Sequence, residues 1–247
     1  MPETPPDPTS GPSGAPRPRR THAQARAEMR EGILRLGREQ LTKNGAAGLS
    51  VREIARGLGV ASSAVYRHVR DRDELITLLI VDAYTALADC VDGALAELED
   101  AGPADRLRTL AHALRSWAVT DPARWALIYG SPVPGYAAPA DDTVPPGTRV
   151  MVTLLKILAE GHPDTESRTT PAPLSGPLAG ALEEGAREFG IAASPPDHLA
   201  DALDAWVSLI GTVSAEVFGQ LGPDLTALGE ELLDRWIAGT VATFSLD

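Results

Sequence analysis

Apolar side chains recur every three or four positions along most of this 247-residue chain, which is the spacing of amphipathic helices. A first helix is predicted over residues 21–44, where Met29, Ile33 and Leu36 share one side. A longer helix is predicted over residues 73–100. The sequence shows no strand-type alternation bounded by hairpin turns. The pattern therefore predicts an all-α protein.

Six further helices are predicted where the same spacing follows a proline or an aspartate. They cover residues 104–119, 122–130, 147–161, 178–189, 197–221 and 224–244. Proline-rich segments over residues 131–146 and 162–176 predict loops between some of them. The larger part of the chain is therefore expected to be a helical body.

Two short helices joined by a tight turn are predicted before the 73–100 helix. Ser50 and Glu53 fit the S-x-x-E capping box, in which a hydroxyl and a carboxylate bind free backbone amides at a helix start. This box begins a helix over residues 51–57, and Gly59 can take the positive φ of the following turn. A second short helix covers residues 62–69. With the preceding long helix, this is the sequence outline of a helix-turn-helix.

Charge is distributed unevenly along the chain, whose net charge is -12. Residues 1–73 hold 13 Lys and Arg against 8 Asp and Glu, a net charge of +5. Residues 74–247 hold 9 against 26, a net charge of -17. DNA attracts the first segment and repels the second, which favours a polyanion-binding head on an acidic body. The alternative is an arginine-rich tail with ordinary surface scatter.

The N-terminal segment has the composition of a disordered leader. Residues 1–18 hold seven prolines and few large apolar side chains, so residues 1–20 are predicted to be a disordered Pro-rich leader. It ends in a basic cluster of Arg17, Arg19 and Arg20. Such a cluster either reaches a neighbouring DNA groove as a basic arm or stays solvated.

Several classes of protein are disfavoured by what the sequence lacks. Cys90 is the only cysteine, which excludes an internal disulfide and a multi-cysteine metal site. No run approaches about 18 apolar residues and no export signal is present, so we expect a cytoplasmic protein without membrane contact. Nucleophile-elbow, P-loop, zinc-protease and dinucleotide motifs are missing. We therefore expect no catalytic residue, no metal and no cofactor.

Residues 49–75, LSVREIARGLGVASSAVYRHVRDRDEL, resemble the DNA-binding domain of the TetR family of bacterial transcription regulators. The capping box, Ile-Ala, Gly-Val, Tyr-Arg-His and Glu-Leu fall in register. The resemblance implies a three-helix DNA-binding domain over residues 21–72. It also implies a helical ligand-binding and dimerisation domain over residues 73–247.

Three positions depart from the family pattern. Ala61 stands where the family usually has Ser, so a hydroxyl cap for the recognition helix comes from Ser62 or is absent. Arg72 replaces a usual Lys and offers a planar fork to phosphate. The segment Trp206 to Gly211 resembles a C-terminal subtype with a Trp-x-x-x-His-Gly signature, and Ile210 stands at its His.

The recognition helix is expected to enter the major groove, where short polar side chains at its N-terminal end can touch base edges. Candidates for base contact are Ser62, Ser63 and Arg67, with Ala64 near a thymine methyl. The resemblance implies further contacts around the groove and with the DNA backbone. The residues expected there are Ser50, Arg52, Tyr66, His68 and Arg72. The alternatives are that Tyr66 fills the small core and that His68 is merely solvated.

Specific binding by so small a domain usually requires a two-fold dimer on a pseudo-palindrome. The predicted helices over residues 197–221 and 224–244 carry apolar stripes, and the resemblance implies that they pair with their copies in a homodimer. The alternative is that these stripes form intramolecular core.

Four of the eleven aromatic residues fall in the middle helices and the loop between them. In this family such helices enclose a cavity, and its ligand re-spaces the two DNA-binding heads. The candidate ligand-binding residues are His112, Trp117, Trp125, Tyr129, Tyr136, Met151, Leu155 and Trp206. Packed core is the alternative for each of them. A cationic group on the ligand would suit the acidic body and the aromatic faces.

The sequence thus predicts a sequence-specific transcriptional regulator, a repressor released from a palindromic operator by a small molecule. Its expected partners are double-stranded operator DNA, the effector and a second copy of the chain. The alternatives are a DNA-bound regulator or adaptor without an effector, and a small helical enzyme.

Overall fold

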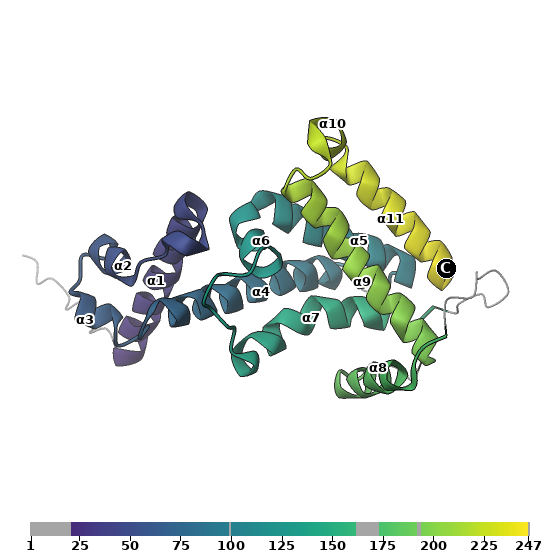
Figure 1. The fold of residues 1–247 in the computed structure, drawn as a ribbon, viewed down its shortest axis with the longest axis horizontal. Helices are drawn as coiled ribbons and strands as arrows, with labels where there is room; N and C mark the ends of the chain where they lie inside the picture. The colour runs from purple at the N-terminus through teal and green to yellow at the C-terminus, as the bar shows by residue number, and fades with distance from the viewer. Residues whose placement is uncertain (1–20, 99, 162–172, 192–193, 247) are drawn as a thin grey trace, which may run out of the picture.

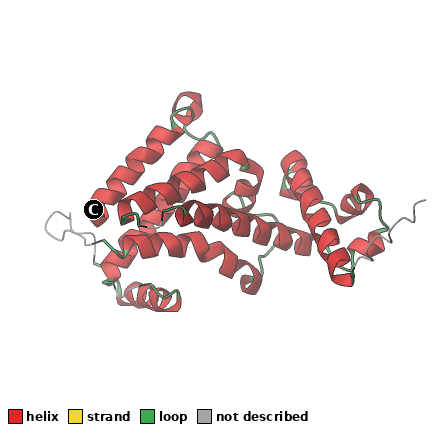
Figure 2. Ribbon diagram, turned by 180° about the vertical axis from the view of Figure 1, so that it is seen from behind, coloured by secondary structure: helices red, strands yellow, loops and turns green. Residues whose placement is uncertain are grey.

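The computed structural model describes residues 21–98, 100–161, 173–191 and 194–246. Within these ranges every regular element is a helix, as Figure 2 shows, which confirms the all-α prediction. The predicted leader over residues 1–20, including Arg17, Arg19 and Arg20, lies outside the described residues.

A small head is formed by the first helices of the chain (Figure 1). These are α1 (His22–Asn44), the short 3-10 turn η1 (Ala46–Gly48), α2 (Val51–Gly57) and α3 (Ser62–Val65). Thr21 starts α1 with a complete capping box, because its side chain and that of Gln24 each accept the other's backbone N–H. The head has its own core, which includes the buried residues Ile33, Leu41, Ile54, Val65, Val69 and Leu75.

The predicted capping box at Ser50 is only half formed. Its hydroxyl accepts the Glu53 N–H at 3.4 Å, as expected. The Ser50 N–H, however, donates to Oε1 of Gln40 at 2.9 Å rather than to the Glu53 carboxylate. Gln40 lies on α1, so a contact between two helices takes the bond that the local sequence assigned to Glu53. This contact fixes the start of α2 against α1.

The long helix α4 (Arg72–Ala96) runs from the head into the body (Figure 1). Asp71 caps it by accepting the Glu74 N–H at 2.9 Å, and Glu74 in turn accepts the Arg70 N–H at 2.6 Å. The body adds seven helices. They are α5 (Pro103–Thr120), α6 (Pro122–Tyr129), α7 (Ala140–Leu158), α8 (Gly176–Glu188), α9 (Pro196–Val217), α10 (Gly222–Thr226) and α11 (Gly229–Phe244).

The predicted loop over residues 131–146 is partly wrong, because α7 begins at Ala140. Pro145 and Pro146 lie inside this helix and remove two amide donors from its early turns. The carbonyls that lose these donors belong to Asp141 and Asp142, which are exposed residues that water can satisfy.

The two predicted C-terminal helices also have different bounds. α9 ends at Val217 instead of residue 221, and the segment that follows contains Gly219 and Gly222 with φ values of 63° and 78°. A short α10 then precedes α11, so the predicted 224–244 helix is divided. α11 starts at Gly229, where any side chain would overlap the Glu216 carboxylate.

Candidate nucleic-acid interface and ligand cavity

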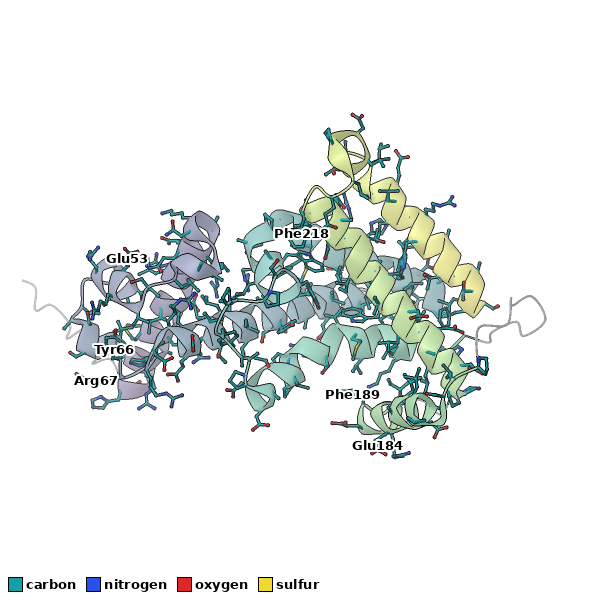
Figure 3. The ribbon with its side chains drawn as sticks, viewed as in Figure 1. Glu53, Tyr66, Arg67, Glu184, Phe189 and Phe218 are labelled. Atoms are coloured by element: carbon teal, nitrogen blue, oxygen red, sulfur yellow. The ribbon has the colours of Figure 1, made fainter. Side chains whose placement is uncertain are left out.

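The predicted base-reading side chains are exposed on α3 and in the turn that follows it. Ser62, Ser63 and Arg67 are exposed and Ala64 is half-buried. Figure 3 shows Tyr66 and Arg67 at the end of the head that points away from the body. Val65, in contrast, is fully buried in the head core and anchors the helix. The short recognition helix is therefore held from beneath and open on its outer face.

Tyr66 does not fill the head core. It is 40% exposed, whereas the neighbouring core positions Val65 and Val69 are 0% exposed. The start of α3 has no side-chain cap, because Ala61 occupies the capping position and Ser62 is the first helical residue. Of the two possibilities for the cap, the structure thus shows that it is absent. The Ser62 and Ser63 hydroxyls have no intramolecular hydrogen bond in the described part of the chain, which leaves them able to contact a ligand.

The arginines of the head fall into two groups by their partners. One group is held within the protein: Arg35 pairs with Glu39 at 2.8 Å, Arg38 with Asp82 at 2.6 Å and Arg70 with Glu74 at 3.0 Å. The other group is exposed and has no carboxylate within ion-pair distance among the described residues. These arginines are Arg26, Arg30, Arg52, Arg56 and Arg67. We call them the five unpaired arginines.

Two of the five unpaired arginines lie on α1, two on α2 and one, Arg67, in the turn that follows α3. Arg26, Arg30 and Arg56 were not among the predicted DNA contacts. Little in the sequence singles them out, because most surface arginines of a helix lie outside its apolar stripe.

A groove of about 680 Å³ lies between the start of α1 and α3. Its lining includes His22, Arg26 and Met29 from one side and Arg67 and His68 from the other. His68 is half-buried here rather than fully solvated. The groove therefore presents cationic and imidazole groups beside the exposed recognition helix, which suits a polyanion.

Two predicted backbone contacts already have partners inside the head. The Ser50 hydroxyl caps α2. The Arg72 guanidinium donates to the Ala46 carbonyl at 3.0 Å and so ties the start of α4 to η1. Arg52 remains exposed on α2. Arg72 thus helps to place the head on α4, whatever contact it also makes with DNA.

Most of the predicted ligand-binding aromatics pack against one another. The Tyr129 ring lies 4.5 Å from Trp125 and 6.4 Å from Trp206, measured between ring centroids, and burial raises the pKa of Tyr129. Trp125 is 0% exposed, and its Nε1 donates to Ser214 Oγ at 3.2 Å. These three residues form part of the body core rather than the wall of a described cavity.

Two other predicted ligand residues lie at contacts between helices. The His112 Nε2 lies 3.0 Å from Asp234 Oδ1, which joins α5 to α11. The Trp117 ring lies 5.2 Å from the Arg124 guanidinium carbon, which joins α5 to α6. Each contact joins two helices of the body, and neither His112 nor Trp117 lines a described cavity.

The remaining three line two different cavities. Tyr136 lines one of about 430 Å³, bounded by α4, α6, the 131–139 loop and the start of α7, which we call the loop cavity. Met151 and Leu155 line an apolar pocket of about 130 Å³ between α7, α8 and α9. The loop cavity adjoins the head, since Tyr136 and Leu127 also pack against the head core.

A three-helix head with an exposed recognition helix and unpaired arginines, carried on a helical body, defines a helix-turn-helix DNA-binding regulator. Comparison with known proteins agrees. Residues 33–79 match the family model described as bacterial regulatory proteins, tetR family. Residues 107–239 match the model of a tetracyclin repressor-like C-terminal domain.

The chain belongs to the TetR family of bacterial transcription regulators. It is 46% identical over 203 residues to the HTH-type transcriptional regulator Rv1816 of Mycobacterium tuberculosis, covering 81% of this chain and 86% of that protein. It is a transcriptional regulator with a DNA-binding helix-turn-helix.

Solved structures show the same architecture. A protein assigned a regulatory role, SCO4313, superposes with a TM-score of 0.67 and 35% identity, over 89% of this chain and 100% of that chain. FadR of Bacillus subtilis, solved in complex with stearoyl-CoA, superposes with a TM-score of 0.51 and 17% identity, over 85% of this chain and 98% of that chain. The second likeness concerns the fold alone.

The described residues contain neither a membrane-spanning helix nor a metal-binding cluster. No helix there combines the length and apolar character needed to cross a bilayer. No group of three or more His, Cys, Asp and Glu side chains there is placed to hold a metal ion.

Proposed function

We propose that the protein is a homodimeric repressor that binds a pseudo-palindromic operator and leaves it when a small molecule occupies the body. The observation that carries the DNA-binding part is the set of five unpaired arginines on the head that presents α3, two of which, Arg26 and Arg67, line the groove beside that helix. On a chain of net charge -12, exposed arginines without acidic partners create the local positive potential that phosphate requires.

Dimerisation is supported by apolar side chains left exposed along the C-terminal helices. Leu203 and Val207 on α9 are 36% and 61% exposed, and Leu225 and Leu228 near α10 are 47% and 43% exposed. Other members of the predicted stripes, such as Trp206, are buried within the chain. The stripes thus divide between intramolecular core and an exposed face that a second copy can cover.

Ligand-controlled release is supported by the position of α6 between the two cores. Ile128 packs against both the body core and the head core. A ligand beside α6 can therefore favour one head position over another. Release by 100-fold requires about 2.7 kcal/mol of coupling between the two sites. The B. subtilis FadR structure with stearoyl-CoA shows that, in that protein, this architecture holds a ligand.

The experiment that tests the proposal is selection of bound duplexes from a random DNA pool, repeated at raised salt. We expect enrichment of one inverted repeat, because two related heads read two half-sites. Raised salt should weaken all binding and leave the sequence preference in place. If no sequence is enriched, or if the enriched sequence is a single site without an inverted repeat, the protein is not a dimeric operator binder.

Removal of Arg67 tests the recognition surface. We expect Arg67→Ala to lower operator affinity by about 10-fold or more, because a good base contact contributes about 1–3 kcal/mol of discrimination. Fluorescence anisotropy with a labelled operator measures this. Arg35→Ala is the matched control, since Arg35 is also an exposed arginine of the head but is paired with Glu39. Equal affinities of the two variants would contradict the placement of α3 in the groove.

A further inference from the structure

The loop cavity has a lining of mixed character without charge. Its apolar wall includes Ile80 on α4, Leu127 on α6 and Val133 in the loop. Among its lining residues none carries a carboxylate or a cationic group. A charged group placed against this wall loses part of its hydration and gains no paired charge, so the cavity disfavours a charged occupant.

Two hydroxyls of the lining already donate their protons within the protein. Thr143 donates to the Pro139 carbonyl at 2.8 Å, and Thr148 donates to the Val144 carbonyl at 2.9 Å. These two hydroxyls therefore keep only acceptor capacity. The Tyr84 hydroxyl makes a longer contact, 3.4 Å, with the Ile128 carbonyl.

Tyr136 meets a second hydroxyl, that of Thr77, at 2.9 Å, and either oxygen of this pair can be the donor. Thr77 Oγ1 also lies 3.0 Å from the Asp73 carbonyl, which can only accept. In either arrangement the Tyr136 oxygen keeps acceptor capacity for a ligand. Ser131, the remaining hydroxyl of the lining, is exposed to solvent.

The electrostatic surroundings disfavour a negative charge near Tyr136. Burial is the main cause that raises the pKa of Tyr136 above its ordinary value, and the charges of Asp73 and Asp142 raise it further against the opposing hydrogen bond to Thr77. What disfavours a tyrosinate here also disfavours a carboxylate or phosphate of a ligand.

We infer that the loop cavity binds an uncharged, mainly apolar molecule through a hydrogen-bond donor such as a hydroxyl, and that it excludes anions. The apolar wall supplies most of the affinity, and the acceptor oxygens of the lining select the donor. The inference rests on the proposed function only where it takes this molecule to be the effector that releases DNA. Binding of the molecule to the cavity can be measured without DNA.

Three probes of one shape separate these properties. They are 4-tert-butylphenol, which donates a proton, 4-tert-butylanisole, which does not, and 4-tert-butylbenzoate, which is anionic. Calorimetry on the full chain should show the phenol binding about 5-fold or more tightly than the anisole, from one hydrogen bond of about 1 kcal/mol. The benzoate should bind at least 10-fold more weakly than the phenol. Equal binding of the phenol and the anisole, tighter binding of the benzoate, or no binding of any probe would overturn the inference.

A matched pair of variants locates the binding. Ala138 lines the cavity and Ala137 does not, and both are exposed, so Ala138→Trp should abolish phenol binding and Ala137→Trp should preserve it. Thermal unfolding of both variants confirms that they fold. If Ala138→Trp fails to fold, Val144→Trp, at an exposed lining residue, replaces it. Unchanged binding in the filled cavity would overturn the assignment.

Operator release is measured separately with the same probes. If the phenol binds as expected and the operator stays bound, the ligand class stands and the proposed release by this cavity fails. If the benzoate binds best while the operator is still bound specifically, the ligand class fails and the DNA-binding proposal stands.

Discussion

Asp82→Asn is expected to destabilise the protein by about 2–3 kcal/mol, because it removes a carboxylate that is shared by two arginines. Arg38 of α1 binds Asp82 through Nε at 2.9 Å and Nη2 at 2.6 Å. Arg124 of α6 binds the same carboxylate at 2.9 Å and the Asp82 carbonyl at 3.0 Å. The side chains of Asp82 and Arg124 are 14% and 12% exposed. Without this carboxylate the two arginines keep only longer contacts, Arg38 with Glu31 and Arg124 with Asp121, both at 3.6 Å, so their partly buried charges are poorly compensated.

The size of this effect follows from the partial burial of the group. Fully buried pairs cost about 3–5 kcal/mol when one partner is removed, and exposed pairs cost about 0–1 kcal/mol. The Arg38 side chain is 32% exposed, which lowers the expected loss below the fully buried range. An asparagine also turns an amide donor toward a guanidinium that is itself only a donor.

Urea unfolding measures the loss, and Asp92→Asn is the matched control. Asp92 lies on the same helix and pairs with Arg149, but its side chain is 49% exposed. Arg149 also keeps a second partner, Asp89, at 3.0 Å. The control should lose no more than about 0.5 kcal/mol. Similar losses in both variants would show that the carboxylate at 82 has no special part in joining α1, α4 and α6.

The sequence predicted the helix-turn-helix better than the cavities of the body, for a physical reason. The helix-turn-helix depends on local signals, namely helix starts, a turn glycine at Gly59 and a short apolar pattern. In the structure Val65 is buried, while Ser62 and Arg67 are exposed. Even here, the bond between Ser50 and Gln40 could not be predicted, because it joins two helices ten residues apart in sequence.

The position of a cavity depends on which side chains face each helix from neighbouring helices. The spacing of residues along one helix does not carry this information. Trp125 and Tyr129 occupy a helix face that could meet either a void or another side chain, and in the fold they meet each other and Trp206. The cavity instead forms where the 131–139 loop bends over α4 and α6. The sequence predicted a proline-rich loop over residues 131–146 and a helix over residues 147–161. Nothing in either pattern marked Thr143 or Thr148 as part of a site.

Val207→Glu is expected to break the homodimer and to lower operator affinity by about 100-fold or more. Val207 is the most exposed large apolar residue of α9, at 61%. If a second copy covers this face, the substitution buries a carboxylate without a partner on both sides of a two-fold interface. A monomer then reads one half-site, and loses the binding energy of the second head.

The fold of the single chain should survive this change, since an exposed substitution away from caps and pairs costs about 0.5 kcal/mol or less. Val119→Glu is the matched control, because Val119 is 46% exposed on α5, outside the proposed interface. Sedimentation measures the oligomeric state, and anisotropy with the selected operator measures affinity. The control should remain a dimer with full affinity. A Val207→Glu variant that sediments as a dimer and binds the operator normally would show that the two copies meet on another face, and that the exposed stripe of α9 serves a different partner.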